Sequence, residues 1–303
     1  MEILQTTADC REALNGARAT GRTVGLVPTM GALHAGHRSL MERARAECDV
    51  VAVTIFVNPL QFGEAADIDN YPRTLDADLG ICAAAGVDVV FAPTVREMYP
   101  SWPSAVPTTV SVQGVSEYWE GASRPGHFDG VSTVVAKLFS IAGPCRAYFG
   151  EKDFQQLAVV RQMTHDLSLP VDVVGCPIVR ELDGLALSSR NVRLSADERS
   201  AATVLSRALA AGRAQFGDGP VLASMVTEAM RRVVASEPTI DLDYAVAVGS
   251  DDLIEREVIE DPTSVRLLIA AIVGPVRLID NSEAVEHAAP PARVRERQLE
   301  RVG

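Results

Sequence analysis

The chain has 303 residues, 47% of them hydrophobic, so it is long enough to bury a large core in one or two domains. Its formal net charge of −12 argues against a general nucleic-acid-binding protein, because such proteins need a basic surface. The five cysteines are widely spaced and form no Cys-x-x-Cys pair, which indicates reduced thiols rather than a disulfide or zinc framework. No signal-peptide pattern is present, and the best apolar run, residues 267–276, is too short to cross a bilayer. We therefore expect a soluble, cytoplasmic protein that binds neither nucleic acid nor a membrane.

Predicted strands and helices alternate over residues 1–179. The β-branched run at 49–57 is typical of a strand buried on both faces of a parallel sheet. Further strands are expected at residues 2–4, 24–27, 87–91, 109–112, 145–149 and 171–174, and helices at about 8–20, 38–48, 71–85 and after residues 130 and 153. This order predicts an α/β fold with a Rossmann-like, doubly wound parallel sheet.

The pattern changes near residue 180. Two helices are expected at about 195–215 and 219–236, followed by apolar strands at 240–248, 264–273 and 276–279. We interpret residues 180–281 as a smaller C-terminal α+β domain that acts as a lid. Residues 282–303 contain a Pro-Pro pair and closely spaced arginines, and they predict a disordered tail to which no role is assigned.

The most informative stretch is residues 27–37, Val-Pro-Thr-Met-Gly-Ala-Leu-His-Ala-Gly-His, between a predicted strand and a predicted helix. Gly31 and Gly36 allow positive φ angles and close approach of a ligand to the backbone. His34 and His37 would reach the amino end of the helix, where unpaired N–H groups attract phosphate. A metal site is a weaker interpretation, because no suitable third ligand lies nearby. Two surface histidines without a role are the other alternative.

Two later loops, each of which follows a glycine, carry positively charged side chains. Lys152 follows Gly150 at a second strand-to-helix junction, where a phosphate-binding role is favoured over a solvated surface lysine. Ser188, Ser189 and Arg190 follow a glycine turn, and they suit either a triphosphate clamp or a cap for the helix that begins near residue 195. The chain has no Gly-x-x-x-x-Gly-Lys-Ser/Thr string, so kinase-type transfer is not supported. Three such loops at one sheet edge would form an ATP site suited to nucleotidyl transfer.

Neutral amides and a second basic pair complete the candidate site. Asn58 and Gln61 follow the strand at 49–57 and suit a hydroxy acid or an amino acid, with loop capping as an equal alternative. Arg124 and His127 stand before the next helix. The arginine suits a carboxylate, whereas the histidine is equally consistent with a brace for its loop.

In chain order these motifs resemble those of the pantothenate synthetase (pantoate–β-alanine ligase) family, in the nucleotidylyltransferase superfamily. The resemblance spans residues from about 20 to 280 and is carried by the strings at 28–37, 58–63, 120–130, 150–153 and 188–191. It implies that ATP drives the condensation of pantoate with β-alanine to pantothenate, a step towards coenzyme A, through a pantoyl adenylate, with release of AMP and pyrophosphate. It also implies Mg²⁺ with the ATP and a homodimer.

The resemblance assigns roles to single residues as well. The implied catalytic residues are His34, His37, Lys152, Ser188, Ser189 and Arg190. ATP contacts are implied for these six residues and for Met30, Gly31, Gly36, Gly150, Glu151, Asp153, Val179 and Leu187. Contacts with pantoate or β-alanine are implied for Met30, Asn58, Gln61, Arg124, His127 and Gln156. Metal ligands stay open, with Asp78 as a candidate.

Two competing hypotheses differ in function class. An adenylyltransferase that acts on a phosphate substrate would need further basic residues where this chain has neutral amides. A catalytically silent nucleotide-binding module would not need the complete set of histidines, lysine and arginine. Release of pyrophosphate in the presence of pantoate distinguishes the ligase from both.

Overall fold

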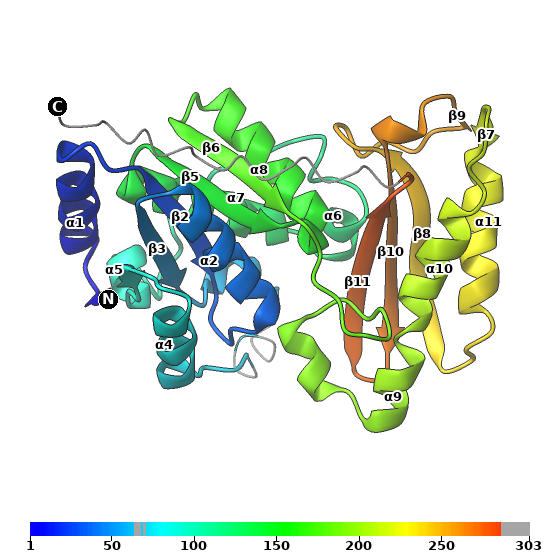
Figure 1. Cartoon of the computed structure of the whole chain (residues 1–303), viewed down its shortest axis with the longest axis horizontal. Helices are drawn as coiled ribbons and strands as arrows, with labels where there is room; N and C mark the ends of the chain where they lie inside the picture. Colours follow the sequence, from blue (N-terminus) through cyan, green and yellow to red (C-terminus); the bar gives the residue numbers. More distant parts are fainter. Residues whose placement is uncertain (64–67, 69–70, 286–303) are drawn as a thin grey trace, which may run out of the picture.

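A six-stranded parallel sheet forms the framework of the N-terminal part of the computed structural model, which describes residues 1–63, 68 and 71–285 (Figure 1). In spatial order the strands are β1 (Glu2–Leu4), β4 (Val89–Phe91), β3 (Val50–Ile55), β2 (Val24–Thr29), β5 (Cys145–Gly150) and β6 (Val171–Cys176). All neighbouring strands run parallel. The prediction of a doubly wound parallel sheet is confirmed.

The strand order reverses between β2 and β5. The chain first adds β3 and β4 on one side of β2, and later adds β5 and β6 on the other side. At such a switch point, the loops that leave the carboxyl ends of two adjacent strands diverge and leave a crevice. Here those loops are the histidine-bearing stretch after β2 and the lysine-bearing stretch after β5. The topology therefore brings two of the predicted phosphate-binding loops together.

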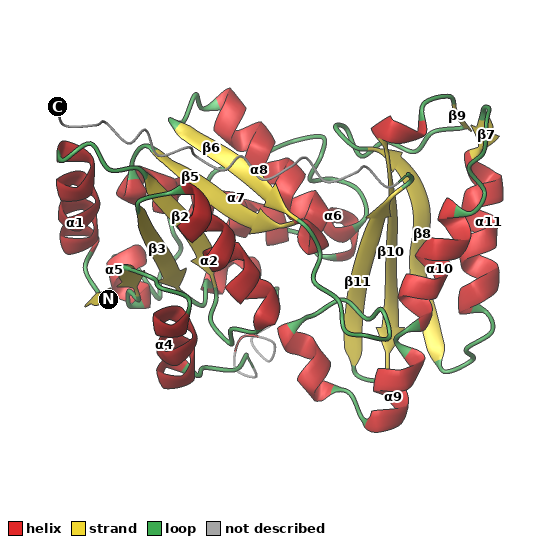
Figure 2. Ribbon diagram, in the orientation of Figure 1, coloured by secondary structure: helices red, strands yellow, loops and turns green. Residues whose placement is uncertain are grey.

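Helices cover both faces of the parallel sheet (Figure 2). One buried core contains side chains of α1 (Thr7–Ala19), α7 (His127–Ala142) and α8 (Phe154–Asp166). The other contains side chains of α2 (Ala35–Glu47) and α4 (Leu75–Ala84). Within β3, Ala52 belongs to the first core, whereas Val51 and Val53 belong to the second. Burial on both faces explains why this strand is apolar at consecutive positions.

A three-stranded antiparallel sheet follows in the C-terminal part of the chain. Its strands in spatial order are β11 (Val276–Glu283), β10 (Val265–Val273) and β8 (Ile240–Gly249). On one face, α10 (Val204–Arg213) and α11 (Ala223–Val234) pack on the sheet through side chains such as Leu205 and Met230. Residues from the other face, Val246 and Leu268, belong to the same core as α1, α7 and α8. The two sheets therefore share a hydrophobic core.

Short elements connect these layers. They are η1 (Pro59–Gln61), α5 (Val95–Met98), α6 (Glu120–Ser123), η2 (Glu151–Asp153), η3 (Ser189–Arg193), α9 (Ala196–Ala201), β7 (Val221–Leu222), β9 (Val258–Ile259) and η4 (Pro262–Ser264). All five cysteine thiols are free, and all but Cys145 are buried. Across residues 1–63, 68 and 71–285, no helix is both long and apolar enough to cross a membrane.

Several predicted elements are wrong in detail. The strand expected at 109–112 does not form; instead the N–H of Val110 donates a hydrogen bond to Oγ1 of Thr133 at 2.9 Å, so a side chain takes the place of a neighbouring strand. The helix expected at 195–215 is two helices, α9 and α10, because the chain turns at Ala202 and Thr203.

The remaining differences concern where elements begin and end. α4 begins at Leu75 rather than residue 71, and α11 begins at Ala223, because the preceding residues form β7 and pair with β9. The sequence predicts a disordered tail from residue 282, but residues 282 and 283 still belong to strand β11. They pair with β10, and Glu283 lies opposite Arg266. The rest of the predicted tail, from residue 286, lies outside the described residues.

Candidate active site

A single cavity at the switch point is lined by loops that the sequence singles out. Its predicted ATP-contacting residues are Met30, His34, Gly36, His37, Gly150, Lys152, Asp153, Val179, Leu187, Ser188, Ser189 and Arg190. The predicted residues for the two acids are also on its wall: Asn58, Gln61, Arg124, His127 and Gln156. Gly31 and Glu151 do not line it. The parallel sheet thus brings loops that are far apart in the sequence to one crevice.

Two histidines cap the amino end of α2. Nδ1 of His34 accepts a hydrogen bond from the N–H of Gly36 at 3.1 Å, and Nδ1 of His37 accepts one from the N–H of His34 at 3.3 Å. An accepting ring nitrogen carries no proton, so each neutral ring has its proton on Nε2. Both histidines therefore keep an Nε2–H donor for a ligand in the cavity. The cap also explains why α2 begins at Ala35, ahead of the predicted start at residue 38.

Both imidazoles are neutral at neutral pH. Burial, and then the charge of Lys152, lower the pKa of His34 below its usual value of 6.5. Burial and the adjacent His34 lower the pKa of His37 to about 3. The ring centroids are 4.1 Å apart, so two charged rings would repel each other strongly. Positive charge in the cavity therefore comes from Lys152, Arg190 and Arg124 rather than from the histidines.

Asp78 of α4 braces the loop between β2 and α2. Its two carboxylate oxygens accept hydrogen bonds from the N–H groups of Ala32 and Leu33 at 3.0 and 2.8 Å, and its side chain is buried. Gly31 has a φ of +85°, and a Cβ there would stand 2.9 Å from Oδ2 of Asp78. Asp78 therefore supports the backbone of the histidine loop and does not line the cavity, which is a different role from the metal ligand considered above.

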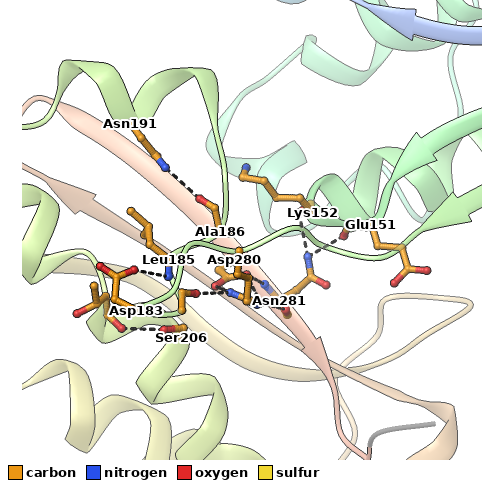
Figure 3. A network of polar contacts seen from close by, with 12 residues as sticks. Glu151, Lys152, Asp183, Leu185, Ala186, Asn191, Ser206, Asp280 and Asn281 are labelled. Carbon is orange, nitrogen blue, oxygen red and sulfur yellow. Dashed lines mark hydrogen bonds and ion pairs between the residues drawn. The ribbon is translucent and has the colours of Figure 1, made fainter. Parts of the chain in front are cut away.

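The loop after β5 places neighbouring side chains in opposite directions (Figure 3). Lys152 lines the cavity, with Nζ 3.8 Å from Oδ1 of Asp153. Burial favours the neutral acid at Asp153, but Lys152 and then Arg190 outweigh it and lower the pKa of that carboxyl. The carboxylate of Glu151 instead accepts a hydrogen bond from Arg266 of β10 at 3.1 Å. The side chain of Glu151, for which the resemblance implies an ATP contact, therefore anchors the loop to the antiparallel sheet and does not line the cavity.

The segment after β6 carries the second cation. Oγ of Ser188 accepts a hydrogen bond from the N–H of Arg190 at 3.2 Å and so begins the η3 turn. α9 has its own capping box, in which Ser195 and Glu198 bond each other reciprocally. The alternative that Ser-Ser-Arg caps the helix near residue 195 is therefore wrong. Arg190 lines the cavity together with both serines.

Tyr71 is a cavity residue that sequence reasoning missed. It lines the cavity together with Ser189, and burial raises its pKa. Its ring packs edge-on against Phe62, with centroids 5.7 Å apart. Tyr71 thus brings the chain before α4 to the same cavity wall as the Ser189 segment. From the sequence alone, Tyr71 could be recognised only as the first residue of the predicted helix at about 71–85.

Asn58 holds Gln61 in place. Nδ2 of Asn58 donates to Oε1 of Gln61 at 2.9 Å and to the carbonyl of Gly130 at 3.0 Å. Oδ1 accepts from the hydroxyl of Tyr99 at 2.8 Å and from the N–H of Leu60 at 3.3 Å. The geometry favours the loop-capping alternative for Asn58, because its amide is fully engaged. Since Oε1 of Gln61 is the acceptor in this bond, Nε2 is the atom left to donate to a ligand, and Gln61 lines the cavity.

His127 braces the same loop from α7. Nδ1 donates to the carbonyl of Gln61 at 2.9 Å, and Nε2 accepts from Arg124 at 3.2 Å, because a guanidinium only donates. Burial and the charge of Arg124 lower the pKa of His127 to about 4, so the neutral ring that makes both bonds persists at neutral pH. The bracing alternative is favoured for His127, and Arg124 stays on the cavity wall.

Comparison with known proteins identifies the family. A model of the pantoate–β-alanine ligase family matches residues 2–283. The chain belongs to this family. A pantothenate synthetase from Roseiflexus sp. (strain RS-1) is 51% identical over 281 residues, which are 93% of this chain and 98% of the relative. A bifunctional pantoate ligase/cytidylate kinase from Thermosynechococcus vestitus is 49% identical over 92% of this chain but only 54% of its own length, so this chain spans about half of that relative.

Solved structures of ligases from the family have the same fold. Pantothenate synthetase from Thermus thermophilus matches with a TM-score of 0.86 at 47% identity, over 94% of this chain and 100% of that chain. A pantoate–β-alanine ligase from Francisella tularensis, complexed with β-γ ATP and β-alanine, matches with a TM-score of 0.76 at 33% identity, over 94% of this chain and 98% of that one.

An apolar wall of the ligase-family cavity could not be recognised from the motifs. It contains Phe56, Phe62, Val131, Val134, Val135 and Leu138. The valines and Leu138 repeat at helical spacing on α7, which is the pattern of ordinary core packing. Only the spatial position of α7 beside η1 shows that part of this face lines a cavity.

Proposed function

We propose that the protein is an ATP-dependent pantoate–β-alanine ligase that forms pantothenate and releases AMP and pyrophosphate. The observation that carries the proposal is the cavity at the switch point between β2 and β5. There the Nε2–H donors of the two histidines, Lys152 and Arg190 stand in the same cavity as Gln61 and Gln156. Relatives that share about half of their residues with this chain bear this activity in their names.

The acid compartment suits the chemistry of pantoate, a hydroxy acid with two methyl groups on one carbon. The methyl groups fit against the α7 valines, and burying apolar surface there is favourable by roughly 25 cal/mol per Å². Nε2 of Gln61 is free to donate to a hydroxyl or carboxylate oxygen. The amide of Gln156, which also lines the cavity, makes no side-chain hydrogen bond to any other described residue.

The proposed reaction has two steps. The pantoate carboxylate attacks the α-phosphorus of ATP, the bond to the bridging oxygen breaks, and pyrophosphate leaves. The amine of β-alanine then attacks the acyl carbon of pantoyl adenylate, loses a proton and displaces AMP. Neither step needs a nucleophile from the protein, so the residues contribute position and charge. Lys152 and Arg190 stabilise negative charge on the phosphates, and the neutral histidines donate hydrogen bonds.

Mg²⁺ is proposed to enter with ATP. In proteins this ion keeps several waters and binds through one or two carboxylates and the substrate phosphates. The cavity fits that mode, because ionised Asp153 lies on its wall. The described residues contain no cluster of three or more His, Cys, Asp or Glu side chains that could hold a metal by themselves. When bound, the ion would neutralise phosphate charge.

The organisation of the molecule is proposed on the same family grounds. Residues 1–179 form the nucleotide- and pantoate-binding domain, and residues 180–281 form the lid domain. The homodimer and the cytoplasmic location rest on the family resemblance. Support for a lid comes from the segment of Ser188 and Ser189, which lines the same cavity as Tyr71 of the N-terminal part.

The experiment that tests the function is pantoate-dependent exchange of label between pyrophosphate and ATP in the absence of β-alanine. The proposal expects exchange that requires pantoate and Mg²⁺, and pantothenate formation when β-alanine is added. No exchange with active wild-type protein would overturn the adenylate step. Exchange that depends on a phosphate-bearing acceptor instead of pantoate would favour a different nucleotidylyltransferase.

A further inference from the structure

Two consecutive buried residues of β11 fasten both phosphate loops to the antiparallel sheet (Figure 3). The carboxylate of Asp280 accepts two hydrogen bonds from Arg180 at 2.6 and 2.9 Å. Arg180 pairs with Ala186 across the turn that precedes Ser188, so Asp280 holds the base of the Ser188–Arg190 loop. The next residue, Asn281, reaches the other loop.

Asn281 binds the backbone of the lysine loop. Its Nδ2 donates to the carbonyl oxygens of Glu151 and Lys152, each at 2.9 Å. These bonds use both amide protons. The side chain is 2% exposed and does not line the cavity, so it touches no substrate there. Its contact with Lys152 is with the backbone alone.

Arg266 fixes which way the amide of Asn281 faces. Nε of Arg266 donates to Oδ1 of Asn281 at 2.7 Å, so the oxygen and nitrogen of the amide cannot exchange places without loss of hydrogen bonds. Arg266 is itself held, because it donates to Glu151 at 3.1 Å and lies 4.3 Å from the ring centroid of Phe154. A buried amide with every group satisfied is rigid, since any rotation leaves a buried polar group unpaired.

We propose that Asn281 is a positioning residue for Lys152, which sets where the ammonium group stands relative to the two histidine donors. The inference rests on the proposed nucleotidyl transfer, where Lys152 faces the phosphates. Lys152 has a flexible side chain, so the place from which its ammonium group reaches the cavity depends on the backbone that Asn281 holds. A displacement of about 1 Å at such a group lowers a rate by about 100-fold.

The test uses two variants of the full chain and one control on the same strand. Asn281→Asp keeps Oδ1 for Arg266 but puts a second oxygen against two carbonyls. Asn281→Ala removes the amide and covers the case in which the aspartate variant does not fold. Ser282→Ala is the control, because Oγ of Ser282 is buried and has no hydrogen-bond partner among the described residues. Each variant is also made in a Lys152→Ala background.

Two readouts separate positioning from general damage. The first is the rate of pantoate-dependent pyrophosphate exchange, with KM values for ATP and pantoate; the second is the affinity for Mg-ATP without pantoate. We expect Asn281→Asp and Asn281→Ala to lower the exchange rate about 10-fold or more with an unchanged pantoate KM. The same two substitutions should also weaken ATP binding, but only in the protein that retains Lys152. In the Lys152→Ala background the same substitutions should change neither quantity further.

The outcomes distinguish this inference from the proposed function. Losses that multiply with those of Lys152→Ala, or that Ser282→Ala reproduces, would overturn the positioning role. A wild-type rate in both Asn281 variants would do the same. If the wild-type protein binds Mg-ATP but shows no pantoate-dependent exchange, the proposed function fails, while non-additive ATP affinities still support the coupling of Asn281 with Lys152.

Discussion

The two ring nitrogens of His37 have different roles, one in the fold and one in ligand binding. Nδ1 accepts the N–H of His34, whereas Nε2–H has no hydrogen-bond partner among the described residues, and His37 lines the cavity. Asparagine places an acceptor near the position of Nδ1, whereas glutamine places an N–H near the position of Nε2. We predict that His37→Asn lowers pantoate-dependent exchange by about 100-fold, the usual loss for one donor to a developing oxyanion. His37→Gln should keep more of the rate.

Thermal unfolding of the same variants supplies the control. Both variants should melt within about 1 kcal/mol of the wild type, because an amide oxygen at position N3 of α2 can accept the N–H of His34 as Nδ1 of His37 does. A faster exchange rate in His37→Asn than in His37→Gln would show that the Nε2–H donor is not what the reaction uses.

The half-buried His127 also contributes to how the fold responds to acid. The pKa of His127 is lowered by burial and by Arg124 to about 4, below the value of about 6.5 in an unfolded chain. Between these two values the unfolded chain binds a proton that the folded protein does not. The free energy of unfolding therefore falls as the pH falls, by up to about 1.4 kcal/mol per pH unit for this ring.

We predict that His127→Gln flattens this dependence. Urea denaturation of the variant and the wild type at pH 7, 6 and 5 gives the difference between their slopes, in which the shared carboxylates cancel. The wild type should lose more stability than the variant on going from pH 7 to pH 5. Parallel curves would mean that His127 titrates alike in the folded and unfolded states.

Residue types in the motifs indicated the cavity, but they did not indicate which way each side chain faces. Asn58 and Glu151 stand in strings that resemble the family, yet each is held by a partner far along the chain. The hydroxyl of Tyr99 is 41 residues from Asn58, and Arg266 is 115 residues from Glu151. Such partners depend on tertiary packing, which no local pattern contains.

At the scale of elements, the approach of α7 to η1 shapes the acid compartment. Gly130 allows it: a Cβ at this position would lie 2.4 Å from the carbonyl of Leu60 and 2.6 Å from the nitrogen of Gln61. Both are backbone atoms, so the η1 turn would have to move. We predict that Gly130→Ala lowers stability by about 1–3 kcal/mol and raises the pantoate KM more than the ATP KM.

Gly16→Ala is the matched control for this prediction. Gly16 lies inside α1, and a Cβ there would meet nothing within 4 Å. The change should stabilise the protein by up to about 1 kcal/mol without an effect on either KM. Equal KM values for Gly130→Ala and the wild type would separate the η1 turn from pantoate binding.

Strong periodic patterns predicted the elements well, and tertiary contacts decided the exceptions. The buried run of β3 was recognisable because both of its faces are apolar. The start of α2 was not, since histidine is not a typical N-cap residue and this cap needs two of them. At Val110 the side chain of Thr133 takes the place of a strand partner, which the β-branched pattern alone cannot reveal.

At the scale of the whole molecule, the shared core predicts one cooperative unfolding transition. Val246 and Leu268 of the antiparallel sheet are buried in the same cluster as Phe149 and Leu138 of the N-terminal part. Trp119 reports this contact directly, because its Nε1 donates to the carbonyl of Leu253 at 2.9 Å. Loss of either part would expose apolar surface of the other, so neither should unfold alone.

Urea unfolding of the full chain, followed by tryptophan fluorescence and by far-ultraviolet circular dichroism, tests this coupling. The two probes should give the same midpoint, since helices such as α10 and α11 would be lost together with the Trp119 contact. Trp102→Phe leaves Trp119 as the only tryptophan and should keep that coincidence. A fluorescence transition that precedes the loss of helix would show that the antiparallel sheet separates as an independent unit. In that case residues 180–281 would form a separately folding unit, whereas coincident transitions mean that the shared core makes the two parts unfold together.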